Sequence, residues 1–181
     1  MKQIYLDNAA ATKVDPAVKK EMQQAEEVYY NPSSFHDLGS EANKILNDCR
    51  EKISKILNAS SQEIIFTSGG TESINLAIKG FAFANKAKGS HMITTKIEHH
   101  AVLNTCRYLE KQGFKVTYLD VDKQGLLDIE KLKKAITKET ILISVIYANN
   151  EIGTIQNISE IGKISKEKNI AFHTEACQAY L

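Results

Sequence analysis

Side chains that could bind or transform a ligand gather directly after four apolar segments of the sequence. They include hydroxyls, histidines, amides and carboxylates: Thr67, Ser68, Thr71 and Glu72, then Glu98, His99 and His100, then Asn149, Asn150 and Glu151, then His173, Glu175 and Gln178. If the apolar segments are parallel strands, their carboxyl ends meet at one edge of a sheet, where open α/β proteins bind ligands. The pattern therefore predicts a ligand site at that edge.

The segment TSGGTES at 67–73 has the composition of a phosphate-binding turn. Gly69 and Gly70 let the backbone approach an anion closely, and the N–H groups at the start of the following helix point toward it. Thr71 adds a hydroxyl group. The segment is neither a Walker A motif nor a GxGxxG fingerprint, and a plain tight turn before a capped helix is the alternative interpretation.

Three further side chains suit a planar ligand. His99 could place its flat ring against such a ligand, whereas a metal site that combines it with Glu98 and His100 is disfavoured, because adjacent helical side chains point in different directions. Asn150 offers amide donors for a phenolate or carboxylate, or belongs to a turn. Glu175 is either a solvated acid or, if buried beside a ring nitrogen, keeps that nitrogen protonated. Together with the glycine turn, these residues indicate a planar, phosphorylated heteroaromatic ligand.

Apolar segments and amphipathic helical patterns alternate along the chain and would position these residues. Strands are predicted at 63–66, 92–95, 114–121, 140–149 and 170–174, and helices at 38–57, 70–87, 99–112, 128–137 and 159–168. This alternation requires a mostly parallel sheet with helices on both faces, so the predicted fold class is α/β. Before these elements we expect a short strand at 5–6, a helix at 16–29 and a domain boundary near NPSS at 31–34.

The composition is that of a soluble globular protein. Charged residues make up 25% and hydrophobic residues 43% of the 181 residues, and 23 Lys and Arg stand against 22 Asp and Glu. This balance gives no electrostatic basis for nucleic-acid binding. Because no apolar run reaches the roughly 18 residues of a membrane span and no signal peptide precedes the first strand, we expect a cytoplasmic protein without membrane association. Cys49, Cys106 and Cys177 have neither disulfide nor zinc-site spacing.

The chain resembles the cysteine desulfurases of the NifS/IscS group, which are pyridoxal-phosphate enzymes of aminotransferase class V with fold type I. Six segments match in the family's order and spacing: YLDNAAAT at 5–12, NPSS at 31–34, FTSGGTESINLAIKG at 66–80, IEHHAV at 97–102, NNEIGTIQ at 149–156 and HTEACQA at 173–179. The resemblance implies that residues 1–30 belong to the small domain or an arm, and residues 31–181 to the first part of the large cofactor-binding domain.

The resemblance implies roles for several site residues. Gly70 and Thr71 match the family's phosphate-binding turn. His99 matches the histidine that stacks on the pyridoxal ring and helps to move protons. Asn150 matches the asparagine that binds the phenolic oxygen of the ring, and Gln178 matches a glutamine near the same oxygen. No metal is implied.

The sequence departs from the family pattern at three points. Glu175 stands in place of the aspartate that pairs with the pyridinium nitrogen and keeps the ring an electron sink. The extra methylene moves the carboxylate by about 1.5 Å, and misplacements near 1 Å can cost about a hundredfold in rate. Ala11 replaces the second threonine of the family's NAATT. The third departure is length: family chains are about twice as long, and the lysine linked to the cofactor, the persulfide cysteine and a substrate-binding arginine have no counterpart here.

The resemblance also implies a reaction. Family members are homodimers that take sulfur from L-cysteine as an enzyme-bound persulfide, release L-alanine and pass the sulfur to an acceptor or iron–sulfur scaffold protein, for cluster assembly or tRNA thiolation. We expect the 181 residues to be a truncated, cofactor-binding part of such an enzyme, inactive alone and binding pyridoxal phosphate without a covalent link at best. The alternatives are a non-catalytic binding or scaffold remnant, and a selenocysteine lyase or other class V aminotransferase. Cys177 could be considered as a persulfide carrier, but a small residue packed beside the site is the simpler interpretation.

Overall fold

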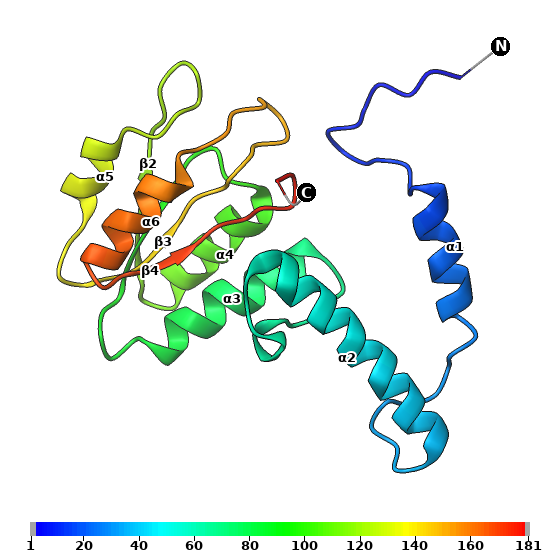
Figure 1. Ribbon diagram of the computed structural model, residues 1–181. Helices are drawn as coiled ribbons and strands as arrows, with labels where there is room; N and C mark the ends of the chain where they lie inside the picture. The colour runs from blue at the N-terminus through cyan, green and yellow to red at the C-terminus, as the bar shows by residue number, and fades with distance from the viewer. Residues whose placement is uncertain (1–2, 180–181) are drawn as a thin grey trace. The chain divides into compact units, whose positions relative to one another are not determined.

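The computed structural model describes residues 3–179 of the chain. The chain divides into two compact units, Met1–Phe66 and Thr67–Leu181. The first unit runs from blue to cyan and the second from green to red in Figure 1. The domain boundary predicted near residue 31 refers to the domains of the whole family fold and stays a prediction. None of the helices in the described part of the chain is long and apolar enough to span a bilayer.

The first unit is built from helices. It contains α1 (Pro16–Ala25), α2 (Asp37–Leu57) and the short 3-10 helix η1 (Ser61–Glu63). Asp15 starts α1, because its carboxylate accepts a hydrogen bond from Ala17 N–H at 2.7 Å and a proline follows at the first helical position. Asn58 ends α2 in the left-handed region, with φ 51°. The two helices predicted for this part of the chain are thereby confirmed, although α1 ends four residues early.

Two predicted strands in this unit are wrong. Residues 5–6 and 64–66 belong to no strand, and Glu63 belongs to η1. The backbone of Ile64 is extended, with φ −93° and ψ 119°, but Ile65 is 69% exposed and no described segment pairs with it. An apolar run predicts extended backbone, whereas a strand also requires a hydrogen-bonded partner.

The second unit is an α/β fold, as predicted. Its elements are α3 (Gly70–Ala84), β1 (His91–Thr95), α4 (His100–Lys111), β2 (Lys115–Leu119), α5 (Ile129–Ala135), β3 (Thr140–Ser144), α6 (Ile158–Glu167) and β4 (Ala171–His173). The strands form a four-stranded sheet in the order β2-β1-β3-β4 (Figure 1), and every pairing is parallel. β3 is shorter than the predicted 140–149, because the chain leaves regular strand pairing after Ser144 to form the candidate site.

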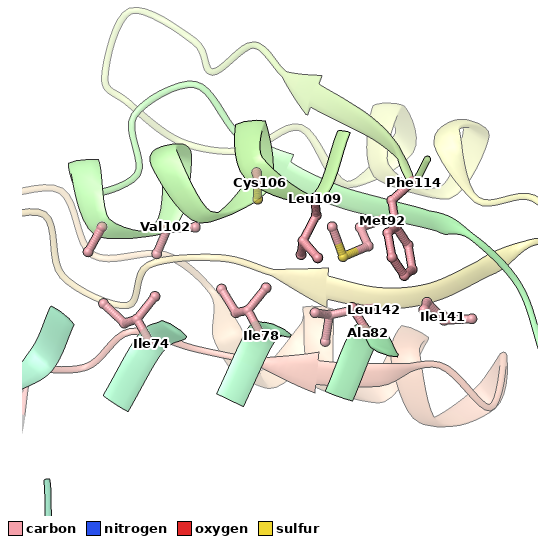
Figure 2. Close-up of a cluster of buried hydrophobic side chains, with 11 residues drawn as sticks. Ile74, Ile78, Ala82, Met92, Val102, Cys106, Leu109, Phe114, Ile141 and Leu142 are labelled. Atoms are coloured by element: carbon pink, nitrogen blue, oxygen red, sulfur yellow. The ribbon is translucent and has the colours of Figure 1, made fainter. Parts of the chain in front are cut away.

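Helices cover both faces of this sheet. Met92 and Leu142 point toward α3 and α4, where they join one buried cluster with Ile78 and Leu109 (Figure 2). The alternate strand residues belong to a second cluster on the α5 and α6 face, formed by Ile93, Leu119, Leu127, Leu132, Ile143, Val145, Ile161 and Ile170. Successive side chains of a strand point to opposite faces, so the apolar runs of β1 and β3 are buried on both sides.

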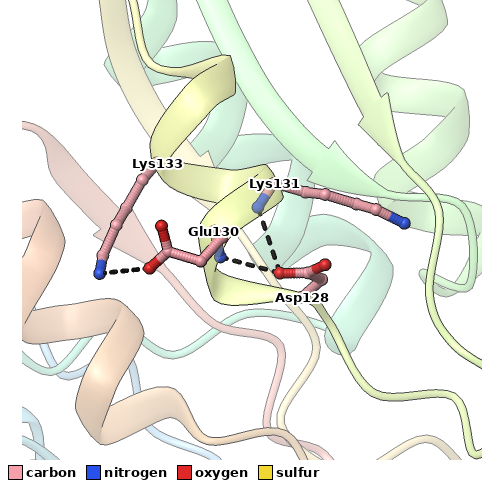
Figure 3. Close-up of polar contacts among 4 residues, drawn as sticks. All are labelled: Asp128, Glu130, Lys131 and Lys133. Carbon is pink, nitrogen blue, oxygen red and sulfur yellow. Dashed lines mark hydrogen bonds and ion pairs between the residues drawn. The ribbon is translucent and has the colours of Figure 1, made fainter.

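The start of α5 illustrates how local hydrogen bonds set the helix ends. Asp128 Oδ1 accepts from Glu130 N at 2.9 Å and from Lys131 N at 3.3 Å (Figure 3). Lys133 Nζ lies 2.8 Å from Glu130 Oε1 on the exposed face. Because exposed ion pairs contribute little, the carboxylate cap and the buried Leu132 define this helix.

The core predicts a large stability effect at one position. Ile143 is fully buried, so Ile143→Ala should lower the free energy of unfolding by about 2 to 5 kcal/mol. Ile155 is 63% exposed, and the control Ile155→Ala should cost less than about 0.5 kcal/mol. Urea unfolding of the 181-residue chain measures both values. Equal losses of unfolding free energy in the two variants would contradict the described core. If Ile143→Ala does not fold, Ile143→Val takes its place, with an expected loss of about 1 kcal/mol.

Candidate active site

The start of α3 presents backbone N–H groups that no side chain caps. Gly69 precedes the helix in an extended conformation, and it makes no side-chain capping bond. Glu72 Oε2 accepts from both the N–H and the hydroxyl of Ser68, each at 2.6 Å, and these bonds lower the pKa of Glu72. The carboxylate therefore braces the base of the turn. Gly70 and Thr71 remain exposed at the helix start, which is the arrangement that binds anions.

The turn after β4 lies against this helix start. A Cβ atom placed on Gly70 would come within 3.1 Å of Cys177 Sγ, which is closer than ordinary van der Waals contact. The glycine thus allows the two segments to approach each other. The structure brings the predicted phosphate seat and the residues after β4 into one site, although about a hundred residues separate them in the sequence.

Glu175 is a buried acid rather than a solvated one. The residue is 7% exposed, and its backbone carbonyl accepts a hydrogen bond from Tyr147 N–H at 2.8 Å. Its side-chain Oε1 accepts from Cys177 N–H at 2.6 Å. The first bond fixes the backbone of Glu175 beside the segment after β3, and the second fixes its carboxylate at the turn after β4. Burial thus excludes the solvated acid, and the pairing of Glu175 with a ring nitrogen stays a prediction.

Glu175 also determines the chemistry of its cysteine neighbour. The pKa of the Cys177 thiol is raised to about 11, mainly by a hydrogen bond to the Glu175 carboxylate and secondly by burial. The thiolate is the nucleophilic form of cysteine, so this thiol is a poor nucleophile at neutral pH. Cys177 fits the role of a small residue beside α3 better than that of a persulfide carrier.

His99 is held as the N-cap of α4. Its Nδ1 accepts a hydrogen bond from Ala101 N–H at 3.1 Å, so the neutral ring carries its proton on Nε2. The ring is exposed and its orientation is fixed by this cap. The His99 and His100 rings lie 6.3 Å apart and are tilted by 59°, so they do not converge on one point. No cluster of three or more metal-binding side chains occurs within residues 3–179.

The remaining two predicted residues lie in loops at the same ends of the strands. Asn150 follows β3, is half-buried, and donates from Nδ2 to Glu151 Oε1 at 3.5 Å. Gln178 is exposed in the turn after β4. Their positions after neighbouring strands agree with one site, and their roles toward a ring oxygen stay predictions.

Asn149, which the sequence indicated only as one of several polar residues after a strand, connects two loops at the site. Its Nδ2 donates to Ile97 O at 2.7 Å, and its Oδ1 accepts from the N–H groups of Glu151 at 2.9 Å and Ile152 at 3.1 Å. The side chain thereby ties the loop after β1 to the loop after β3. An asparagine that begins a turn directly after a buried strand is the signal that could have identified it.

Glu98 is the second residue whose structural role could not be predicted from the sequence. It is 5% exposed, and its Oε1 accepts from Thr95 Oγ1 at 2.7 Å and from Ile146 N at 3.0 Å. Burial raises the pKa of Glu98 to about 7, and the nearby charge of Glu175 contributes. The sequence predicted Glu98 only as one of several polar residues after a strand, with metal ligation disfavoured; in the structure it joins the end of β1 to the segment after β3.

A separate hollow lies at the opposite ends of the strands. It has a volume of about 950 Å³, and residues at the starts of β3 and β4 line it, namely Thr140 and Ala171. Four cationic side chains also line this hollow: Lys88, Lys138, Lys166 and Lys168. Open parallel sheets bind ligands at the carboxyl ends of their strands, so the hollow is not the candidate active site.

The residues at the carboxyl ends fit pyridoxal phosphate on structural grounds. An uncapped helix start suits its phosphate, and a Cβ on Gly69 would meet no heavy atom within 4 Å, so a ligand can come close to the backbone there. The buried carboxylate of Glu175 suits a cationic ring nitrogen, and His99 supplies a fixed aromatic ring.

Comparison with known proteins agrees with this fit. The aminotransferase class-V family model matches residues 4–181. Cysteine desulfurase IscS of Clostridium botulinum (strain Hall) is 57% identical over 179 residues, which cover 98% of this chain and 45% of the relative. IscS of Dictyoglomus turgidum is 54% identical over 178 residues, with coverages of 98% and 45%.

Solved structures give the same result. A structure described as a NifS-like protein superposes with a TM-score of 0.94 at 44% identity and covers 98% of this chain and 50% of its own. SspA in complex with cysteine superposes with a TM-score of 0.90 at 42% identity, with coverages of 94% and 50%. The chain thus spans about half the length of the relatives it matches. It belongs to the aminotransferase class-V family.

Proposed function

We propose that this chain supplies the cofactor-binding part of a pyridoxal-phosphate-dependent cysteine desulfurase. The enzyme would remove sulfur from L-cysteine, release L-alanine and pass the sulfur to an acceptor or iron–sulfur scaffold protein. The observation that carries the proposal is the close approach of the uncapped start of α3 to the turn after β4, where Glu175 is buried. The family membership restricts the chemistry that such a site performs.

Each site residue has a defined task in this proposal. The N–H groups of Gly70 and Thr71, with the Thr71 hydroxyl, hold the phosphate. Glu175 places a negative charge beside the ring nitrogen, and His99 holds a proton on Nε2 that it can exchange with a substrate group. When bound, pyridoxal phosphate supplies an electron sink that allows the substrate Cα proton to leave. Asn150 and Gln178 would bind near the ring oxygen.

The 181 residues do not contain every group that the reaction needs. The family's cofactor-linked lysine and persulfide cysteine have no matching segment among them. We therefore propose that turnover requires residues outside this stretch, that the working enzyme is a cytoplasmic homodimer, and that this stretch alone is inactive.

The Thr71 hydroxyl gives a specific test of the phosphate seat. Thr71→Val keeps the side-chain shape but removes one hydrogen bond to a charged group, so the affinity for pyridoxal 5′-phosphate should fall about tenfold. The affinity for pyridoxal, which lacks the phosphate, should stay within about twofold. Fluorescence titration measures both constants. An equal loss for the two ligands would show that Thr71 does not contact the phosphate.

The proposed activity is tested on the protein in the form that its own cell produces. L-Alanine and sulfide formation from L-cysteine is expected, with an absorbance band of bound cofactor. A higher kcat/KM for L-selenocysteine than for L-cysteine would favour a selenocysteine lyase. A protein that takes up no pyridoxal phosphate would instead be a non-catalytic binding or scaffold protein, and the proposal would be wrong.

A further inference from the structure

Glu98 joins three structural elements directly beside His99. It stands between the end of β1 and the N-cap of α4. Its Oε1 accepts from the Thr95 hydroxyl at 2.7 Å, at the end of β1, and from Ile146 N–H at 3.0 Å, just after β3. The single carboxyl group therefore fastens the segment that leads into His99 onto the neighbouring strand.

The second oxygen of the Glu98 carboxyl group, Oε2, differs from the first in its hydrogen bonding. Oε2 is buried and has no hydrogen-bond partner within residues 3–179. The ionisable groups that face Glu98 are the Glu175 carboxylate after β4 and the Cys106 thiol on α4; β1 and β3 contribute only the neutral Thr95 hydroxyl and Ile146 N–H. None of these described groups is a cation. A carboxylate here would bury a negative charge beside another one, with only the two hydrogen bonds at Oε1 to compensate, whereas the neutral acid leaves only a hydroxyl unpaired.

We propose that Glu98 is a positioning residue of the candidate site: as a neutral acid it fastens the segment that carries His99 onto the end of β3, and its ionisation loosens that segment. Glu98 touches no reacting atom in this account and acts through His99. The inference rests on the proposed function, because it assigns Glu98 to the site that the proposal identifies.

The direction of the pH dependence follows from the buried environment. Burial raises the pKa of Glu98 from its ordinary value of 4.5 to about 7. Between these values the folded chain binds a proton that the unfolded chain has released. The stabilising effect of the proton is therefore complete below about pH 4.5 and is lost as the pH rises through about 7. His99 should be firmly positioned at pH 6 and loosened at pH 8.5.

Glu98→Gln provides the matched variant, because an amide keeps the acceptor at Oε1 and has no charge to acquire. In the ligand-free 181-residue chain, the melting temperature of the wild type relative to Glu98→Gln should fall by at least about 4 °C between pH 5.5 and pH 8.5. The Ala101 N–H group donates to His99 Nδ1 and reports on the position of that ring. Its hydrogen-exchange rate in the wild type should rise at least about fivefold relative to Glu98→Gln over the same pH range. Glu98→Ala should exchange rapidly at both pH values.

Neither readout requires bound cofactor, so failure of the proposed function and failure of this inference are distinguishable. Parallel melting profiles of wild type and Glu98→Gln would show that Glu98 does not hold the proton. A constant exchange ratio at Ala101 would show that the proton does not position His99. Either result overturns the inference. If Glu98→Ala does not fold, the comparison of the wild type with Glu98→Gln is sufficient to test the inference.

Discussion

Glu175→Gln is expected to lower kcat/KM for L-cysteine at least about a hundredfold in the complete desulfurase proposed above. The amide keeps the size of the side chain and its oxygen can still accept from Cys177 N–H, which in the structure lies 2.6 Å from Glu175 Oε1. The substitution therefore removes mainly the negative charge beside the ring nitrogen. Steady-state alanine formation at saturating cofactor measures the effect.

The aspartate found in the family is the matching control. Glu175→Asp restores the charge on a side chain shorter by one methylene, so it should retain at least about a tenth of the wild-type kcat/KM. A Glu175→Gln enzyme within about threefold of the wild type would show that Glu175 does not pair with the cofactor. Loss of activity in both variants, with folding intact, would show that both the charge and the length of the side chain are required.

The 181-residue chain alone is expected to release no L-alanine from L-cysteine beyond the rate of free pyridoxal phosphate. The reason is chemical, since no segment of the chain matches the family's cofactor-linked lysine or its sulfur-carrying cysteine. Cys177 cannot replace that cysteine readily, because its raised pKa of about 11 keeps it a thiol. Chromatographic quantification of alanine, with free cofactor as the control, makes the measurement. Alanine release above that control would mean that the residues present form a complete active site.

Most of the second unit could be predicted because its apolar strands alternate with amphipathic helices. The runs at β1 and β3 are buried on both faces, which is what a parallel sheet requires, and all eight elements occur near their expected positions. The apolar run at 63–66 gave a wrong strand, because burial and pairing depend on a partner that the local sequence does not specify. The sequence likewise did not show that β3 ends at Ser144.

The candidate site was only partly predictable for a similar reason. The glycine turn, His99 and Glu175 carry chemical patterns that can be recognised in one dimension. The contact between Gly70 and Cys177 depends on how helices and strands pack, and no periodicity predicts it. The role of Glu98 could not be predicted, because neither its burial nor its bond to Ile146 follows from the local sequence.

The carboxyl ends of the strands are proposed to form the cofactor seat. NMR titration of the 181-residue chain with pyridoxine 5′-phosphate, which lacks the aldehyde and cannot link to a lysine, tests this proposal. We predict saturable shifts of the amide signals of Gly70, Thr71, His99 and Cys177, from the start of α3, the cap of α4 and the turn after β4. Shifts confined to the lysine-lined hollow at the opposite strand ends, or no saturable shift, would contradict it.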